Sequence, residues 1–163
     1  MAAVGYSLME NEFENSILKF RIPENWTVVD TTQSDTLTGL QPVHNNTTII
    51  TITSTDVSPQ KVVDGYVNNY SSKYPRFKVL KNEPVAVDNE EGIRLVYKNT
   101  GSSDTLFTGP IYISSLVAFS KHNQTYIISS NEVSENYYQK MVEPAMNTLI
   151  NSIRIKDYSS SFD

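Results

Sequence analysis

The chain has 163 residues, of which 39% are hydrophobic and 19% charged, with no cysteine and a formal net charge of −5. A chain of this length buries roughly 70% of its unfolded surface, so a single domain can hold a hydrophobic core without cross-links. The acidic balance argues against nucleic acid as a partner, and the lack of thiols excludes disulfides, cysteine catalysis and cysteine-based zinc sites.

The two ends of the chain differ from the middle. Residues 1–13 are expected to form a flexible N-terminal arm and residues 157–163 a mobile tail, which leaves residues 14–156 as one domain. The first residues have neither the basic nor the apolar region of a signal peptide, and no stretch reaches the roughly 18 apolar residues of a membrane span. We expect a monomer with no membrane span, and a lipid anchor upstream of Met1 is compatible with this sequence.

Alternation with a period of two marks the first strands. Leu18, Phe20 and Ile22 alternate with basic residues, and Pro23 ends the run because it cannot donate to a β-ladder. Further strands are expected over residues 26–29, 36–40 and 47–55.

Two helices are predicted. Ser58 can cap the first, Pro59 suits its first position and Pro75 ends it. Ser134 can cap the second, and Pro144 inside its apolar pattern should kink or split it.

Strands fill the region between the two helices. They are expected over residues 77–82, 93–98, 111–119 and 125–130, with a turn over 88–92 and a hairpin tip over 121–124, and residues 153–155 form a short closing strand. Connections of hairpin length cannot join parallel strands, so the order predicts an α+β fold with a mainly antiparallel sheet.

The sequence contains few residues that could carry catalysis. Its six glycines include no G-x-G pair and no G-x-S-x-G, which excludes the usual dinucleotide loop, Walker loop and nucleophile elbow. The two histidines, His44 and His122, fall in predicted loops. Each could be a general base or a metal ligand, but neither has an orienting partner nearby, and a solvated loop histidine is the favoured interpretation.

Three other patterns have both a functional and a structural interpretation. The turn with Asp88, Glu90 and Glu91 could hold a divalent cation, although adjacent acids in a turn are usually solvated. Residues 73–78 mix lysine, arginine and aromatic side chains and could bind single-stranded nucleic acid or an anionic head group, but they span a predicted helix end and strand start, which favours a structural role. The tyrosine stripe at positions 66, 70 and 74 could be a binding face, but its spacing is that of a helix packed on a sheet.

Several segments resemble, in order, those of a known family. They are Phe20-Arg21-Ile22-Pro23-Glu24-Asn25-Trp26, the β-rich residues 49–53, the helix over 59–74, the strand over 91–97, the hairpin that ends in residues 125–128, and the closing segment 149–154. This succession is similar to the PsbP-like family, which includes a photosystem II extrinsic protein and uncharacterised prokaryotic relatives and shares its fold with a Ran-binding nuclear import factor. The resemblance covers about residues 14–156. It implies an antiparallel sheet of about six strands with helices on both faces, and a non-catalytic accessory or docking role in an exported protein.

The leading hypothesis is a non-enzymatic binding domain of an extracytoplasmic prokaryotic protein, without cofactor, metal or catalytic residues, that binds a protein or a cell-surface component. An Asn/Ser/Thr-rich composition favours export, with a cytoplasmic location as the alternative. No binding residue is transferred from the family, because the matching motifs are those that make the fold. The alternative functions are a hydrolase or metal-dependent enzyme centred on His44 or His122, and a divalent-cation binder using the turn from Asp88 to Glu91.

Overall fold

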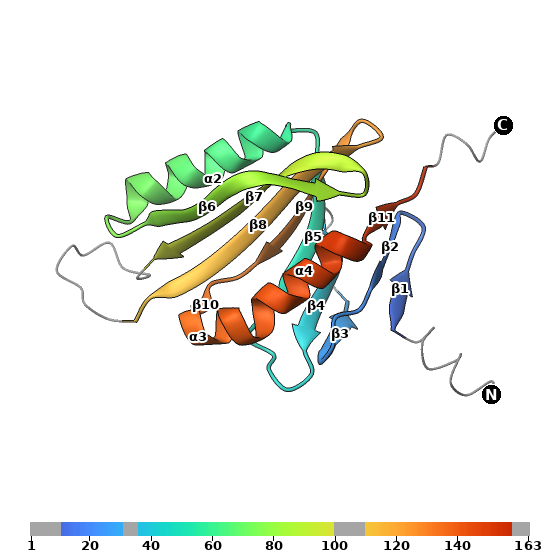
Figure 1. The fold of residues 1–163 in the computed structure, drawn as a ribbon, viewed down its shortest axis with the longest axis horizontal. Coiled ribbons are helices and arrows are strands. Elements are labelled where there is room, and N and C mark those ends of the chain that lie inside the picture. Colours follow the sequence, from blue (N-terminus) through green and yellow to red (C-terminus); the bar gives the residue numbers. More distant parts are fainter. Residues whose placement is uncertain (1–10, 31–35, 100–109, 158–163) are drawn as a thin grey trace.

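The structure, a computed structural model, describes residues 11–30, 36–99 and 110–157. All strand pairs in these residues are antiparallel, and they form a main sheet in the order β3-β4-β5-β9-β8-β7-β6, with β10 paired to β8, and a smaller sheet in the order β1-β2-β11 (Figure 1). The α+β class and the antiparallel sheet are confirmed. The main sheet has more strands than the six expected, and the second sheet was not expected.

The strands of the main sheet are β3 (Trp26–Val29), β4 (Thr36–Pro42), β5 (Ile50–Thr55), β6 (Lys78–Val87), β7 (Glu90–Asn99), β8 (Tyr112–Lys121), β9 (Gln124–Ser130) and β10 (Val133–Ser134). Those of the smaller sheet are β1 (Glu12–Glu14), β2 (Leu18–Arg21) and β11 (Arg154–Ile155).

The smaller sheet changes the expected boundary of the domain. Residues 12 and 13, expected from the sequence to belong to the flexible arm, form β1 together with Glu14, and this strand pairs with β2. The ring of Phe13 stacks on that of Phe20 at 5.2 Å, and Lys156 forms an ion pair with Glu14. These contacts hold the segment at the domain edge. The rest of the arm and most of the tail, residues 1–10 and 158–163, lie outside the described residues.

Both long hairpins of the main sheet turn on two residues. Asp88 and Asn89 connect β6 to β7 with φ of 51° and 64°, and His122 and Asn123 connect β8 to β9 with φ of 51° and 66°. Two-residue turns with positive φ match the twist of the strands they join, and Asp and Asn tolerate this conformation. The turn expected over 88–92 is therefore shorter, since Glu90 already begins β7.

Helix α2 (Pro59–Lys73) covers β7 and β8 on one face of the main sheet. The Ser58 hydroxyl accepts a hydrogen bond from the Lys61 amide at 3.4 Å, as expected of a cap. Val62 and Val63 face a small core formed by Leu95, Tyr97, Leu116 and Ala118.

The C-terminal helix lies on the opposite face (Figure 1) and is interrupted, as Pro144 predicted. It consists of α3 (Glu135–Tyr137), a π-helical turn η1 (Tyr138–Val142) and α4 (Glu143–Ser152). In the π turn the Glu143 amide bonds to the Tyr138 carbonyl, five residues back. A wider turn relieves the clash that a proline ring makes with the preceding helical turn. Among the described residues no helix is long and apolar enough to span a membrane.

The main core lies between the sheet and α4. It contains the largest fully buried side chains, among them Phe20, Phe119, Met146 and Leu149. Trp26 and Ile153 join it, so β2, β3 and the end of α4 share this layer. The smaller sheet thus continues the core past the edge of the main sheet.

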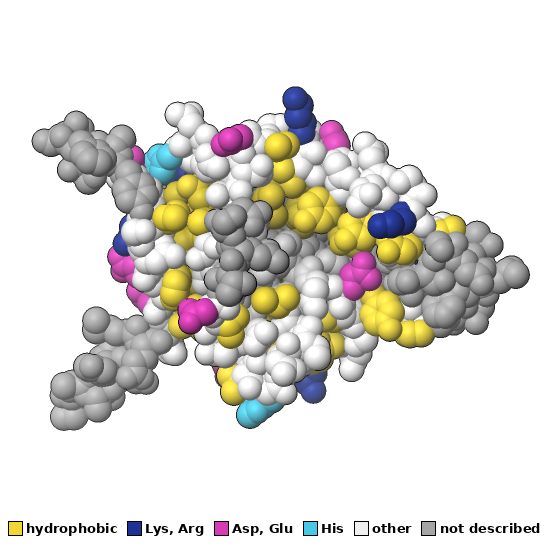
Figure 2. Space-filling model, turned by 180° about the vertical axis from the view of Figure 1, so that it is seen from behind, with side chains coloured by type: hydrophobic (Ala, Val, Ile, Leu, Met, Phe, Trp, Pro, Cys, Tyr) yellow, Lys and Arg dark blue, Asp and Glu magenta, His cyan; other side chains and the backbone are white. Residues whose placement is uncertain are grey.

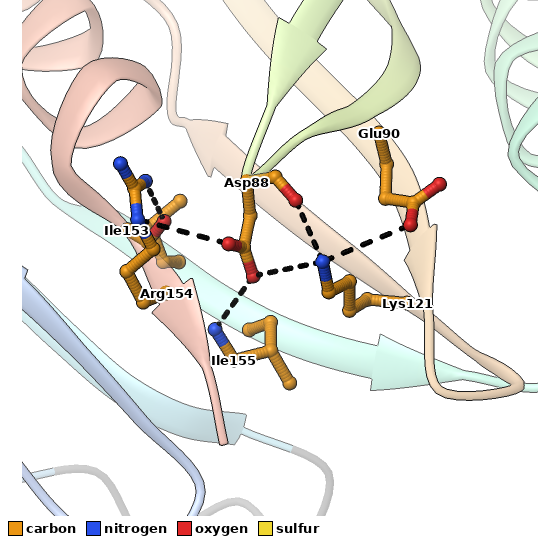
Figure 3. A network of polar contacts seen from close by, with 6 residues as sticks. All are labelled: Asp88, Glu90, Lys121, Ile153, Arg154 and Ile155. Atoms are coloured by element: carbon orange, nitrogen blue, oxygen red, sulfur yellow. Dashed lines mark hydrogen bonds and ion pairs between the residues drawn. The ribbon is translucent and has the colours of Figure 1, made fainter. Parts of the chain in front are cut away.

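A buried carboxylate fastens the smaller sheet to the main one (Figure 3). Asp88 Oδ2 accepts a hydrogen bond from the Ile155 amide at 2.9 Å, and its Oδ1 lies 3.7 Å from Arg154 Nε. Lys121 Nζ lies 3.8 Å from Asp88 Oδ2 and 3.7 Å from Glu90 Oε1, and donates to the Asp88 carbonyl at 2.8 Å. Both long hairpins and the closing strand β11 therefore meet at one side chain, and we call this group the Asp88 clasp.

Two glycines provide a matched test of packing. A Cβ added to Gly92 would lie 2.7 Å from the Ala118 carbonyl oxygen and 2.9 Å from the Phe119 Cβ, whereas one added to Gly65 in α2 would meet nothing within 4 Å. We expect Gly92→Ala to lower the free energy of unfolding by about 1–3 kcal/mol. Gly65→Ala should raise it by about 0.5–1 kcal/mol, because alanine favours the helix. Urea denaturation of both variants checks this, and equal stabilities would contradict the packing.

The Asp88 clasp can be tested with a nearly isosteric change. Asp88→Asn keeps an oxygen for the Ile155 amide and tolerates the positive φ, but removes the charge that Lys121 and Arg154 share. We expect the free energy of unfolding to fall by about 1–3 kcal/mol. Glu90→Gln, at an exposed position, is the control and should change it by less than about 1 kcal/mol. Urea denaturation is again the measurement, and a neutral Asp88→Asn would show that the clasp contributes little.

Candidate functional site

A cavity of about 210 Å³ lies between α2 and the ends of β8 and β9. We call it the tyrosine–serine cleft; its lining comprises Tyr66, Tyr70, Tyr97, Ser114, Ser115, Leu116, Ser129, Ser130, Asn131 and Glu132. A second, more open groove shares Tyr66 and Tyr70 and continues along α2 past Lys61 and Asn69. Figure 2, which views the molecule from behind, shows hydrophobic side chains, a class that here includes tyrosine, gathered in a band across this side of the molecule.

The cleft exists because the ladder between β8 and β9 stops early. Pairing reaches Leu116 and Ser129, and beyond it β8 pairs with β10 instead, so that Asn131 and Glu132 bridge the two partners of β8. At this break the Ser115 amide donates to the Ser130 hydroxyl at 3.1 Å. A side chain therefore replaces the missing ladder acceptor, as a buried amide requires.

Polar side chains close the rest of the break. The Ser114 hydroxyl donates to the Ser130 carbonyl at 2.6 Å, and the hydroxyls of Ser115 and Ser130 lie 3.4 Å apart. The side chain of Asn131 bonds to the Ile49 amide at 3.0 Å and to the Thr47 carbonyl at 2.8 Å, which ties the bridging residues to the segment before β5. The wall of the cleft is thus held in place by its own hydrogen bonds.

Aromatic rings form the opposite wall. Tyr66 and Tyr70 stack at 6.1 Å between centroids, and the Tyr70 ring lies 5.2 Å from that of Tyr97. Burial raises the pKa of the Tyr97 hydroxyl above its ordinary value, and burial also raises the pKa of Tyr66. Both phenols are therefore neutral at physiological pH and offer hydroxyl groups as well as ring faces.

Among the described residues that line the cleft, Glu132 alone carries a carboxylate. Burial raises its pKa above the ordinary value, against the weaker effect of the Asn99 amide, which favours the charged form. Asn99 is itself buried, and neither its Oδ1 nor its Nδ2 reaches a partner at hydrogen-bonding geometry. Glu132 forms no ion pair among the described residues. The cleft thus contains an acid whose charge is poorly compensated.

The sequence candidates lie elsewhere. His44 is exposed beside a shallow groove lined by Val43, Tyr137 and Lys140, and His122 is exposed at the β8–β9 turn. Neither has a hydrogen bond or an ion pair with a carboxylate in the part of the chain that the structure describes. The structure therefore does not bring together the pair that a histidine-based hydrolase would need.

The proposed cation ligands are also separated. The Asp88 carboxylate is held by Lys121, Arg154 and the Ile155 amide, while Glu90 contributes to the same clasp and Glu91 is exposed on β7. No group of three His, Asp or Glu side chains able to hold a metal occurs among the residues described. Two cations already surround the oxygens that a metal would use.

The tyrosines at positions 66, 70 and 74 have features of both interpretations made from the sequence, packing on the sheet and a binding face. Tyr70 packs on Phe77 at 6.0 Å and Tyr74 on Tyr70 at 5.9 Å, which makes Phe77 and the end of α2 part of a structural cluster. Tyr66 and Tyr70 nevertheless keep a half-buried surface on the cleft. Lys73, Arg76 and Lys78 are exposed around this helix end and do not line the cleft.

Sequence analysis missed the other side of the cleft. Ser129, Ser130 and Glu132 were assigned to a strand end and a loop, and Asn99 to a polar loop. The available signal was Ser114-Ser115 inside the strand predicted over 111–119, whose other residues are apolar, since polar residues buried on both faces of a strand need partners.

Glu132 provides a test of the electrostatics of the cleft. Because its pKa is raised in the folded chain, the wild type loses stability as the pH rises from near the ordinary value of 4.5 through the raised value. Glu132→Gln has no carboxyl group to lose a proton and so keeps its stability as the pH rises. Its melting temperature should therefore exceed that of the wild type at pH 7, and the difference between the two should become smaller as the pH is lowered. Glu143→Gln, at another half-buried glutamate, is the control and should not stabilise. An unchanged margin across pH would contradict the assignment.

No protein-family model and no curated protein matches the sequence. Solved structures do match. Cyanobacterial PsbP (CyanoP) from Synechocystis sp. PCC 6803 aligns with a TM-score of 0.62 at 11% identity over 89% of this chain and 91% of that one.

Two further structures match at similar levels. LpqN of Mycobacterium tuberculosis, described as involved in cell envelope biogenesis, gives a TM-score of 0.58 at 13% identity over 94% of this chain and 97% of that one. A protein of Bacteroides thetaiotaomicron VPI-5482 aligns with a TM-score of 0.59 at 10% identity over 91% of this chain. The alignment covers 49% of that protein, so this chain spans about half of its length. At such low identities the likeness concerns the fold, and the chain has the PsbP-like fold.

Proposed function

We propose that the chain is a non-enzymatic binding domain of an extracytoplasmic prokaryotic protein, and that it recognises a protein or cell-surface component through the tyrosine–serine cleft. The observation that supports this most is the cleft itself, a preformed hollow between α2 and a break in the sheet. Ligand sites are typically concave, lined by aromatic groups and provided with a few fixed polar groups.

The polar groups of the cleft suit recognition better than covalent catalysis. The hydroxyls of Ser114, Ser115 and Ser130 bond to one another or to a carbonyl, and no histidine or lysine lines the cavity with them. An activated serine needs an adjacent base, which here would have to be Glu132, and no hydrogen bond links Glu132 to a serine in the described chain. A role in binding requires no such pair.

Export is supported by the composition and by one structural neighbour. The chain is rich in Asn, Ser and Thr. LpqN, which shares the fold over nearly its whole length, is described as involved in cell envelope biogenesis. The location of the present chain is part of the proposal, and fractionation of cells that express the full gene product tests it directly.

Site-specific photocrosslinking tests the binding surface. A benzophenone side chain is introduced at Asn69, an exposed rim position of the groove that joins the cleft, and separately at Lys140, exposed on the helix of the opposite face. We expect adducts in intact source cells from position 69, fewer or none from position 140, and loss of the adduct when Tyr66→Ala is added. Adducts of equal yield from both positions, or none from position 69, would contradict the proposed surface.

A further inference from the structure

The cleft contains a carboxylate, Glu132, that no basic side chain in the described part of the chain compensates. All lysine, arginine and histidine residues of the sequence lie in the described segments, since residues 1–10, 31–35, 100–109 and 158–163 contain none. None of these side chains lines the cleft, and none pairs with Glu132 in the described structure. A half-buried carboxylate without a cation is an unfavourable arrangement that an incoming cation would relieve.

The aromatic wall favours the same kind of ligand. Tyr66, Tyr70 and Tyr97 line the cavity together with Glu132, and the faces of such rings carry partial negative charge that attracts ammonium groups. Because burial keeps the phenols of Tyr66 and Tyr97 protonated, they add acceptor oxygens without adding a full charge. The cleft thus offers an organic ammonium ion both aromatic ring faces and a carboxylate counter-ion.

The size of the cavity and its hydroxyls limit the ligand further. A volume of about 210 Å³ corresponds to roughly seven water molecules, enough for a compact head group. The Ser129 hydroxyl lies 3.3 Å from the Thr51 hydroxyl, and its oxygen, which has two lone pairs, can still accept from an N–H donor. A bare metal ion fits poorly, because a single carboxylate among tyrosine rings offers too few charged oxygen ligands.

We propose that the tyrosine–serine cleft binds the ammonium group of a small organic cation, with Glu132 as its counter-ion and the rings of Tyr66, Tyr70 and Tyr97 around it. This inference rests on the proposed function, because it names the ligand chemistry of the same site. The ammonium group can belong to a free amine or to the head group of a membrane lipid, and the chemistry recognised is the same.

Amide NMR spectra of the full chain provide the test. Methylammonium chloride and tetramethylammonium chloride are titrated, with sodium chloride at equal ionic strength as the reference. We expect saturable shifts of the Ser115, Asn131 and Glu132 amides. Glu132→Gln should weaken binding by roughly tenfold or more, because the ligand loses its counter-charge. Glu143→Gln, the control, should bind like the wild type.

Two further measurements separate charge from shape. Lowering the pH should weaken binding as Glu132 becomes protonated. The other ionisable side chains that line the cleft are those of Tyr66, Tyr70 and Tyr97, and burial raises the pKa of Tyr66 and Tyr97 above the ordinary value. Tyr66→Leu keeps an apolar wall but removes the ring, and should weaken the binding of tetramethylammonium.

Sedimentation with phosphatidylcholine vesicles distinguishes the two sources of the ammonium group. If the ligand is a lipid head group, the protein sediments with the vesicles; if it is a free amine, the protein stays in solution.

Three results would overturn the inference: shifts caused equally by glucose, shifts that persist in Glu132→Gln, or no saturable shift with either ammonium salt at tens of millimolar. These failures can be told apart from failure of the proposed function. Crosslinking from position 69 without ammonium binding would leave a binding domain with another ligand chemistry. Ammonium binding without crosslinking would leave the site but remove the proposed cellular role.

Discussion

The fold depends on the burial of strand β8 on both faces. Leu116 and Ala118 point to α2, while Val117 and Phe119 point to the core under α4, and all four are almost completely shielded from water. A strand that is apolar on both sides needs a cover on each side, so neither helix can be removed without exposing half of this strand. The close approach of Gly92 to β8 shows how little space remains between neighbouring strands.

Charged groups complete the arrangement at the edge of this core. The Asp88 clasp links both long hairpins to β11, so the C-terminal segment is fixed by a charge and a backbone hydrogen bond as well as by apolar contacts (Figure 3). In the clasp a buried acid has two basic partners. In the cleft a half-buried acid, Glu132, has no basic partner among the described residues. The contrast separates a carboxylate that serves the structure from one that is available to a ligand.

The cleft arises from a local departure from regular pairing. Where β9 gives way to β10, serine hydroxyls and the Asn131 side chain take over the hydrogen bonds of the ladder, and the displaced bridging residues leave a hollow next to α2. Breaks of this kind on rigid sheets are suitable places for recognition, since the surrounding strands fix the geometry. The fold shared with CyanoP and LpqN supplies the sheet and the helices that frame the cleft.

The sequence by itself determined the local elements. The alternation of apolar and polar residues predicted β2, and the polar tip between two apolar runs predicted the β8–β9 hairpin. Ser58 and Pro59 predicted the start of α2, and Pro144 predicted the interruption of the last helix. These signals could be recognised because each acts within a few residues of the chain. The tertiary structure alone decided that residues 12–14 join a second sheet, that Asp88 meets Arg154, and that Glu132 faces three tyrosines. Such contacts join residues that are distant in sequence, and their energies depend on burial and pairing that no local pattern encodes.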